Sequence, residues 1–310
     1  MEKDMVIIGG GVAGLSAAQY GARSNLSTLV IEEMAPGGQA LLIADLENYP
    51  GFPEPVNGFQ LSMDMHKQAQ KFGADFMTAS VKKISKEGNN FIIETSKETV
   101  TAKAVVLATG AKHRHLGVPG EEEFGGRGVS YCGTCDGPFF KNKKMLVVGG
   151  GDAACDEANY LANLTDQVVM IHRRDRFRAQ KAVADKVLKN PNIEVRFNTV
   201  VQEIKGNETK VDRVLLAKTD SDEVYEEEFD AVFVFVGSIP QTDLVPEADK
   251  DETGYIITDV HMESSIKGLY AVGDVRNTPF RQLITAASDG AVAAHTASGY
   301  IDDLKGEAYI

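Results

Sequence analysis

The segment VIIGGGVAGLSAAQY at residues 6–20 recurs at residues 146–160 as LVVGGGDAACDEANY. Each copy reads as an apolar strand, a glycine turn and a helix with small residues on one face. The first glycine of such a turn permits the bend, the second lets the backbone approach a pyrophosphate, and the third position keeps the helix close to the sheet. These positions are Gly9, Gly11 and Gly14 in the first copy, and Gly149, Gly151 and Ala154 in the second. The repeat predicts two dinucleotide-binding folds in one chain.

The residues after the second strand of each copy differ in charge. In the first copy these residues are Glu32 and Glu33, and a carboxylate there accepts hydrogen bonds from ribose hydroxyls, as in FAD or NAD sites. The same offset in the second copy begins a basic segment with His172, Arg173, Arg174 and Arg178. Guanidinium groups bind a 2′-phosphate that carboxylates would repel. The second site is therefore predicted to hold NADP(H), and the alternative for the basic segment is a solvated patch.

The order of the elements predicts that one domain is inserted into the other. Residues 1–112 form the first unit, and the glycines and prolines of Gly110–Gly120 are typical of a crossover to a second unit over residues 113–244. A later strand ends in Gly273 and Asp274, which suit hydrogen bonds to a flavin's ribityl chain and pyrophosphate. We therefore expect residues 245–310 to return to the first domain. The predicted fold class is α/β, with two Rossmann-like dinucleotide-binding domains, the second inserted into a split first domain.

Composition and charge exclude several classes of protein. The 310 residues carry a net charge of −13, which is unfavourable for binding nucleic acid. No apolar run approaches the roughly 20 residues that cross a membrane. The N-terminus shows no signal peptide, and three cysteines do not make a secreted disulfide framework. We expect a cytoplasmic protein without a metal site, in which the acidic runs at residues 121–123 and 226–228 are solvated.

The segment Cys132-Gly133-Thr134-Cys135-Asp136 is the candidate redox site. Two cysteines at i and i+3 of a helical turn bring their sulfurs within reach of a disulfide, and a helix N-terminus stabilises a thiolate. A thiolate attacks a partner disulfide and the second cysteine resolves the mixed disulfide, while Asp136 can move the proton. A pair of buried free thiols and a chance surface pair remain alternatives. The third cysteine, Cys155, is expected to pack in the core.

Together these motifs resemble those of the low-molecular-weight, NADPH-dependent thioredoxin reductases, which are class II pyridine nucleotide-disulfide oxidoreductases. The resemblance covers nearly the whole chain and implies FAD in the split domain, NADPH in the inserted domain and a homodimer. It adds Asp152 to the NADPH site. It also adds residues to the FAD site, namely Gly37, Gly38, Gln39, Asn48 (within Glu47–Gly51), Thr109, Gly110, Arg281, Gln282 and Leu283.

The resemblance also implies a role for each member of the redox segment. Cys135 would lie against the flavin, Cys132 would attack the disulfide of thioredoxin, and Asp136 would act as the acid. The inserted domain would rotate about linkers near residues 111–118 and 242–246. The implied function is thioredoxin-disulfide reductase. The alternatives are a flavin disulfide reductase with a peroxiredoxin-type or glutaredoxin-like acceptor, an enzyme with a donor other than NADPH, and a non-catalytic redox-sensing module.

Two residues depart from the pattern of the family. Gly133 stands where many relatives carry alanine, and its backbone freedom is expected to change the disulfide potential. Asp152 stands where relatives often have a small polar residue, and its charge is expected to weaken binding of the pyrophosphate.

Overall fold

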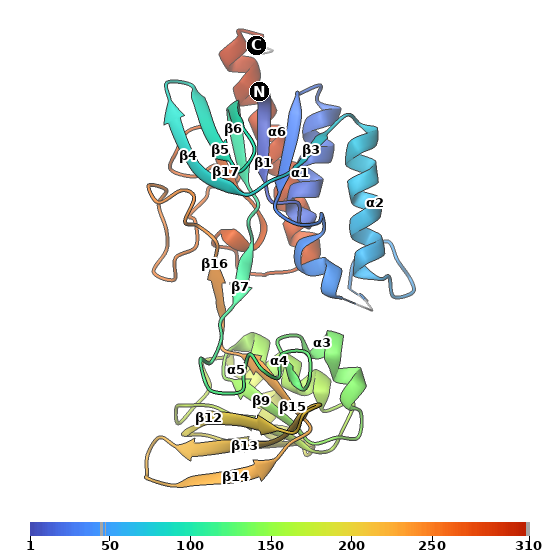
Figure 1. Ribbon diagram of the computed structural model, residues 1–310, viewed down its shortest axis with the longest axis vertical. Helices are drawn as coiled ribbons and strands as arrows, with labels where there is room; N and C mark the ends of the chain where they lie inside the picture. Colours follow the sequence, from blue (N-terminus) through green and yellow to red (C-terminus); the bar gives the residue numbers. More distant parts are fainter. Residues whose placement is uncertain (44–45, 47, 308–310) are drawn as a thin grey trace. The chain divides into compact units, whose positions relative to one another are not determined.

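The computed structural model describes residues 1–43, 46 and 48–307, and the chain divides into two compact units (Figure 1). Unit 1 consists of Met1–Lys112 and Ile239–Ile310, and unit 2 of His113–Ser238. The inserted unit ends at Ser238 rather than at residue 244. The reason is that Leu244 and Val245 pack in a core cluster of unit 1, and the Gln241 N–H donates to the Gly110 carbonyl at 3.0 Å.

Unit 1 is built on a sheet that the chain leaves and re-enters. The strand order is β3-β2-β1-β6-β5-β4, with β17 beside β6. The strands are β1 (Glu2–Ile8), β2 (Thr28–Glu32), β3 (Asp75–Thr78), β4 (Val81–Glu87), β5 (Asn90–Thr95), β6 (Thr99–Leu107) and β17 (Leu269–Ala271). Strand β6 lies parallel to β1 and β17 and antiparallel to β5. The late strand β17 thus completes the sheet that the first hundred residues begin.

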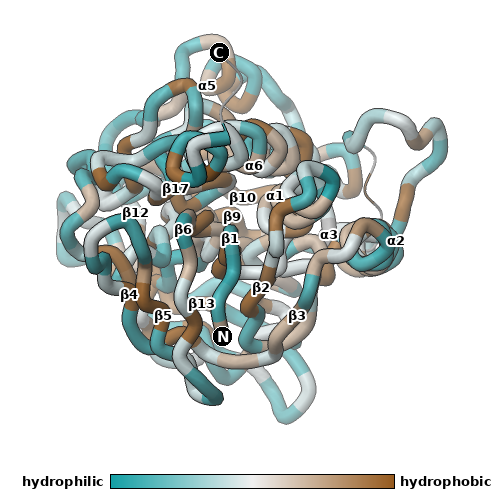
Figure 2. Tube along the Cα trace, turned by 90° about the horizontal axis from the view of Figure 1, so that it is seen from above, coloured by the Kyte–Doolittle hydropathy of each residue, from teal (hydrophilic) through white to brown (hydrophobic). Residues whose placement is uncertain are grey.

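Both faces of the unit 1 sheet are buried. Met5 and Ile7 of β1 pack with α1 (Val12–Arg23) and α6 (Leu283–Lys305), whereas Val6 and Ile8 pack with the opposite cluster. This alternation explains why residues 5–8 of β1 form a continuous apolar run. Helix α2 (Gly58–Lys71) lies beside α1 and is largely hydrophilic, in contrast to β2 and β5 (Figure 2). The short helices are η1 (Gly38–Leu42) and η3 (Gly273–Val275).

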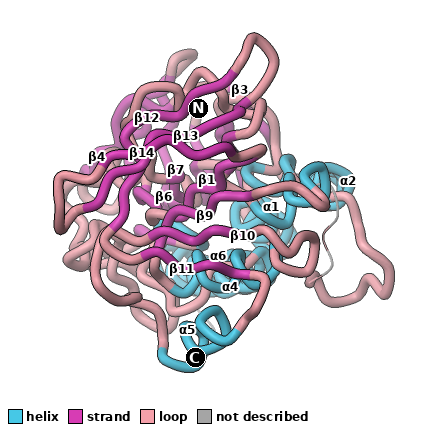
Figure 3. The backbone as a smooth tube through the Cα atoms, turned by 90° about the horizontal axis from the view of Figure 1, so that it is seen from below, coloured by secondary structure: helices cyan, strands magenta, loops and turns pink. Residues whose placement is uncertain are grey.

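Unit 2 repeats the arrangement with a parallel sheet in the order β11-β10-β9-β15-β8. Figure 3 shows β11, β10 and β9 of this sheet side by side. Its strands are β8 (Val129–Ser130), β9 (Met145–Gly149), β10 (Val168–Ile171), β11 (Ile193–Arg196) and β15 (Ala231–Phe235). Met145 and Val147 face the core under α4 (Asp152–Leu161). Leu146 and Val148 face the antiparallel sheet of β12 (Thr199–Gly206), β13 (Val211–Lys218) and β14 (Val224–Glu228).

The remaining elements of unit 2 are α5 (Lys181–Lys189), α3 (Gly133–Asp136) and η2 (Gly137–Phe140). Strands β7 (Ala111–His113) and β16 (Ser238–Pro240) pair with each other where the chain passes between the units. The predicted fold class, an α/β fold with two Rossmann-like parallel sheets, is confirmed.

The prediction of a solvated acidic run at residues 121–123 is wrong for Glu121. This side chain is only 2% exposed. Its carboxylate accepts hydrogen bonds from the backbone N–H groups of Leu116 (2.8 Å) and Gly117 (2.7 Å) and from the Tyr131 hydroxyl (2.9 Å). Glu121 is buried because the turn at residues 116–117 presents N–H groups that need an acceptor.

Candidate functional site

The first glycine turn leaves the N-terminus of α1 open. Gly11 is the N-cap residue, and no described side chain caps it. A Cβ on Gly14 would lie 2.0 Å from the Gly9 carbonyl oxygen, so α1 packs directly on the turn. A Cβ on Gly11 would find nothing nearer than 3.9 Å among the described atoms. Free N–H groups, the helix dipole and open space together make an anion site.

Glu32 is held beside this turn at the end of β2. Its Oε2 accepts a hydrogen bond from the Gly10 N–H at 2.6 Å, and its Oε1 accepts one from the Met34 N–H at 3.0 Å. The neighbouring Glu33 is exposed. Glu32 is thus oriented by the backbone of the glycine turn, in the position that favours contact with a ribose.

The residues that the resemblance adds at 37–39 lie next to the same turn. The Gly37 N–H donates to the Gly10 carbonyl at 2.7 Å, and Gly37 has a φ of +133°, which favours glycine. The Gln39 side-chain amide donates to the Ala111 carbonyl at 2.6 Å. Residues 10, 11 and 37 thus line one edge of the anion site.

The late segment of unit 1 reaches this turn through Gly273. A Cβ on Gly273 would lie 3.1 Å from the Ala13 Cβ, so η3 contacts α1. The Gly273 N–H donates to Asp289 Oδ2 at 3.1 Å, and Asp289 also pairs with Arg276. Burial raises the pKa of the neighbouring Asp274 carboxyl. Unit 1 therefore brings residues from both ends of the sequence to one site.

The other residues expected at the FAD site have partners within unit 1. The Asn48 side chain donates to Gln282 Oε1 at 2.9 Å, and Gln282 caps α6, which begins at Leu283. The Thr109 hydroxyl donates to the Gln241 carbonyl at 2.6 Å. The Arg281 guanidinium lies 4.0 Å from the centre of the Tyr255 ring. Gly110 has a φ of +67°, and Glu47 lies outside the described residues.

The second glycine turn has the same open geometry. Gly151 is the N-cap residue of α4, and a Cβ there would meet no described atom within 4 Å. A Cβ on Gly149 would lie 2.6 Å from the Ala154 Cβ, which keeps α4 close to β9. The Asp152 carboxylate accepts a hydrogen bond from the Gln180 N–H at 2.6 Å. The negative charge of Asp152 is therefore partly neutralised by a backbone N–H at the N-terminus of α5.

The basic segment folds back onto this turn. The Arg178 N–H donates to the Gly150 carbonyl at 2.7 Å, and the Arg173 carbonyl accepts a hydrogen bond from Thr219 Oγ1 at 3.2 Å. The side chains of Arg173, Arg174 and Arg178 are exposed, and none forms an ion pair with a described residue. The backbone is thus fixed while the guanidinium groups stay available for an anion.

His172 packs under the second turn. A Cβ on Gly150 would lie 2.3 Å from His172 Nδ1, so glycine is needed there to admit the ring. The His172 Nε2 atom is buried and has no hydrogen-bond partner within the described part of the chain. Burial lowers the pKa of His172, and Arg173 and Arg174 lower it further. The imidazole is therefore neutral at pH 7.

The candidate redox segment forms a short helical turn. Cys132 is disulfide-bonded, and the backbone of Cys135 lies in α3, but its side chain is outside the described part of the structure. The Cys132 N–H donates to Ser130 Oγ at 3.1 Å, and Cys132 Sγ lies 3.5 Å from Thr134 Oγ1. The Asp136 N–H donates to the Cys132 carbonyl at 3.1 Å. Hydrogen bonds from the backbone N–H and to the carbonyl of the disulfide-bonded Cys132 therefore fix the backbone of this turn.

A family model described as pyridine nucleotide-disulphide oxidoreductase matches residues 3–291. The chain belongs to this family, among its thioredoxin reductases. It is 57% identical over 302 residues to the thioredoxin reductase of Treponema pallidum, covering 97% of this chain and 98% of that protein. It is 43% identical over 304 residues to that of Listeria innocua, covering 97% and 95%. The crystal structure of Lactococcus lactis thioredoxin reductase matches with a TM-score of 0.80 at 43% identity, covering 97% and 99% of the two chains.

Membership of the thioredoxin reductases confirms the resemblance and makes the chain an oxidoreductase. It implies a flavin and a nicotinamide cofactor. Both glycine turns fit the pyrophosphate of such a group, because a side chain at Gly11 or Gly151 would enter the open space that each helix N-terminus faces.

Cys155 is confirmed as a core residue of this thioredoxin reductase family member. It is fully buried and has a free thiol. Burial raises the pKa of this thiol to about 11, so it stays protonated at pH 7.

Glu157 was not among the predicted site residues, but it contacts the redox turn from α4. The backbone N–H groups of Gly133 and Thr134 act to lower the pKa of its carboxyl, and a Cβ on Gly133 would lie 2.3 Å from its Oε2 atom. The signal was present in the sequence, because Glu157 interrupts the apolar stripe of Ala154, Ala158 and Leu161 at helical spacing.

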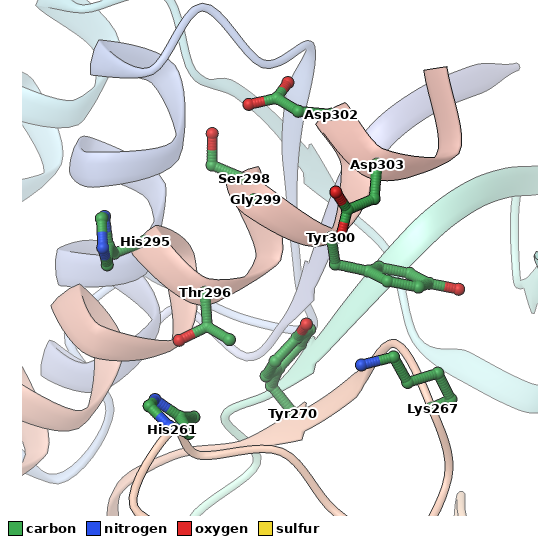
Figure 4. A pocket seen from close by; sticks show the side chains of 10 residues that line it. All are labelled: His261, Lys267, Tyr270, His295, Thr296, Ser298, Gly299, Tyr300, Asp302 and Asp303. Carbon is green, nitrogen blue, oxygen red and sulfur yellow. The ribbon is translucent and has the colours of Figure 1, made fainter. Parts of the chain in front are cut away.

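A cavity of about 460 Å³ in unit 1 is lined by none of the predicted site residues (Figure 4). His261, His295 and Tyr300 contribute to its lining, as does Tyr270, whose hydroxyl is buried without a partner among the described residues. No described helix is long and apolar enough to cross a membrane, and no described cluster of His, Cys, Asp or Glu could hold a metal ion.

Proposed function

We propose that this chain is an NADPH-dependent thioredoxin-disulfide reductase that uses FAD and the pair Cys132 and Cys135. The observation that carries the proposal is a disulfide-bonded Cys132 in a turn that packs on α4, the helix of the second nucleotide turn. The first glycine turn would hold FAD, which when bound would supply electron transfer between NADPH and the disulfide. The proposed location is the cytoplasm, where protein thiols are kept reduced.

The residues of unit 1 would bind and orient FAD. The N–H groups at the start of α1 face the position of the pyrophosphate, and Glu32 would accept hydrogen bonds from a ribose. Gly273 and Asp274 would contact the ribityl chain and the pyrophosphate from the other side. The remaining residues of the predicted FAD site would support this binding.

The residues of unit 2 would select NADPH. The side chains of Arg173, Arg174 and Arg178, which pair with no described carboxylate, support binding of a 2′-phosphate beside the second glycine turn. His172 would support the loop as a neutral ring. A thioredoxin reductase with a donor that lacks this phosphate would gain nothing from the basic segment, so these residues favour NADPH.

The cysteine pair would then exchange with thioredoxin. After reduction, the Cys132 thiolate would attack one sulfur of the thioredoxin disulfide, forming a mixed disulfide and releasing one thioredoxin thiolate. The Cys135 thiolate would attack Cys132 Sγ, which restores the disulfide of the chain and releases the second thioredoxin thiolate. Asp136 would donate the proton that the leaving thiolate takes up.

Serine substitutions test this assignment. Cys132→Ser and Cys135→Ser are each expected to abolish reduction of thioredoxin, because neither variant can form the internal disulfide. Reduction of bound flavin by NADPH should persist in both. Cys155→Ala is the matched control, since this buried thiol lies in the core, and it should reduce thioredoxin. Thioredoxin reduction that survives in both serine variants would contradict the proposal.

A homodimer is also proposed. Tyr20, Phe52 and Ile284 of unit 1 are large, exposed and apolar, and they line a groove of about 600 Å³ with residues of α1, α2 and α6. Exposed apolar surface of this kind favours association.

A further inference from the structure

Two glycines allow the redox turn to pack closely on α4. A Cβ on Gly137 would lie 2.6 Å from Leu161 Cδ2, and a Cβ on Gly133 would lie 2.3 Å from Glu157 Oε2. Heavy atoms do not approach so closely without displacement. Both atoms lie at the ends of flexible side chains, so glycine at these two positions lets Glu157 and Leu161 contact the redox turn without being displaced.

The backbone at residue 133 does not itself require glycine. Gly133 is not among the glycines with a φ in the left-handed region, so alanine is compatible with its conformation. The residue is fully surrounded, and the atom nearest to its missing side chain belongs to Glu157. An alanine here would have to displace the end of the flexible Glu157 side chain, so glycine leaves the carboxylate room to lie against residue 133.

The Glu157 carboxylate is oriented toward the redox turn. A Cβ on Gly133 would lie 2.3 Å from its Oε2 atom, which is buried without a hydrogen-bond partner among the described residues. The backbone N–H groups of Gly133 and Thr134 stabilise the charged form of the carboxyl and so act to lower its pKa. Burial, and to a smaller extent Asp156, raise the pKa of Glu157 to about 7. Burial of a carboxylate among the apolar side chains of a helix lowers the stability of the fold, so its presence here indicates that its contacts have a structural or functional role.

The contact with Thr134 extends to the reacting sulfur. The Thr134 N–H interacts with the Glu157 carboxyl, and the Thr134 hydroxyl lies 3.5 Å from Cys132 Sγ. The same N–H groups were expected to stabilise a Cys132 thiolate, but they also interact with the Glu157 carboxyl. Glu157 thus fixes the backbone between the two cysteines and limits stabilisation of the thiolate by the helix N-terminus.

We propose that Glu157 is a positioning residue for the redox turn, which holds residues 133 and 134 and thereby sets the geometry of Cys132, and that Gly133 is the partner this contact requires. The inference rests on the proposed function. It concerns the cysteine pair rather than the identity of the acceptor, so the two can fail separately.

The first test compares Glu157→Ala and Glu157→Gln with the wild-type holoenzyme. Loss of the two backbone contacts in Glu157→Ala should lower kcat for thioredoxin reduction by roughly tenfold or more, whereas the amide of Glu157→Gln should restore it to within about threefold. The KM for thioredoxin and the rate of flavin reduction by NADPH should change by less than about threefold in both. Asp166→Asn removes an exposed carboxylate beyond α4 and is the control for charge.

The second test is a double-mutant cycle with Gly133→Ala. In the presence of Glu157 the new methyl group collides with the carboxylate, so Gly133→Ala should slow the reaction. In the Glu157→Ala background the space is free, so Gly133→Ala should slow thioredoxin reduction by a factor at least about threefold smaller than it does in the presence of Glu157. If Glu157→Ala does not fold, Glu157→Asp takes its place, because its shorter side chain retreats from residue 133.

The equilibrium of the cysteine pair with reduced and oxidised glutathione gives a readout that needs no thioredoxin. The same coupling between positions 133 and 157 should appear there as a non-additive change in the equilibrium constant. Additive effects in both assays, or a Glu157→Ala enzyme with wild-type kcat, would overturn the inference. A wild-type enzyme that fails to reduce thioredoxin while the glutathione coupling persists would overturn only the proposed acceptor.

Discussion

The exposed arginines at 173, 174 and 178 combine a fixed backbone with guanidinium groups that pair with no described carboxylate. The charge reversal between Glu32 and this segment was visible in the sequence, because the repeat placed both at the same offset. The hydrogen bonds that orient Glu32 through Gly10 and Met34 were not visible, since they depend on the folded turn. Glu121 was misjudged for the same reason, because its partners become available only when the turn at 116–117 has formed.

Arg173→Ala combined with Arg174→Ala is expected to raise the KM for NADPH by about tenfold or more, since each charge-assisted contact is worth about 1.5–3 kcal/mol. The KM for NADH should change little, because NADH lacks the 2′-phosphate. Steady-state kinetics with both coenzymes measure the difference. Arg176→Ala, an exposed arginine of the same loop, is the matched control. Equal effects on the two coenzymes would contradict assignment of the 2′-phosphate to this loop.

The paired strand–turn–helix elements were predicted well from the sequence, because a buried parallel strand ending in glycine gives a strong local pattern. The antiparallel strands β12, β13 and β14 were not anticipated, since half-buried strands of mixed polarity carry a weak signal. The contact of α3 with α4 was also missed. It depends on two glycines facing a neighbouring helix rather than on any pattern within α3.

The two outer glycines of the second turn should respond differently to alanine. Gly151→Ala enters open space, so the melting temperature should be nearly unchanged, but the methyl group should weaken NADPH binding by blocking approach of the pyrophosphate. Gly149→Ala would place Cβ 2.5 Å from the Phe235 carbonyl, and a clash of this kind costs about 1–3 kcal/mol. Thermal unfolding and NADPH titration measure the two effects. A Gly151→Ala variant with both wild-type stability and wild-type NADPH affinity would contradict the assigned site.

At the scale of the whole molecule, the sequence predicted that the chain leaves one sheet, builds a second unit and returns. Strand β17 joins β6 because Leu269–Ala271 is an apolar strand, bounded by Gly268 and Gly273, that a sheet can bury on both sides. The exact return point was not predictable, since it depends on Leu244 and Val245 packing in the core of unit 1. The roles of residues 111–118 and 242–246 as hinges stay predictions.

The homodimer is a prediction for the same scale. Light scattering should give about twice the 33.5 kDa mass of the chain. Ile284→Asp should shift the mass toward the monomer, because the charge would enter the apolar groove that Tyr20 and Phe52 also line. Lys97→Asp, at an exposed residue that does not line the groove, controls for the added charge. A monomeric wild-type protein at micromolar concentration would contradict the prediction.

The central claim is that electrons pass from NADPH through this chain to thioredoxin. It is tested most directly by measuring NADPH consumption by the purified holoenzyme, with insulin as the terminal disulfide, with and without thioredoxin. We predict rapid consumption that requires thioredoxin and saturates with its concentration. Consumption that is the same in the presence and absence of thioredoxin would contradict the claim.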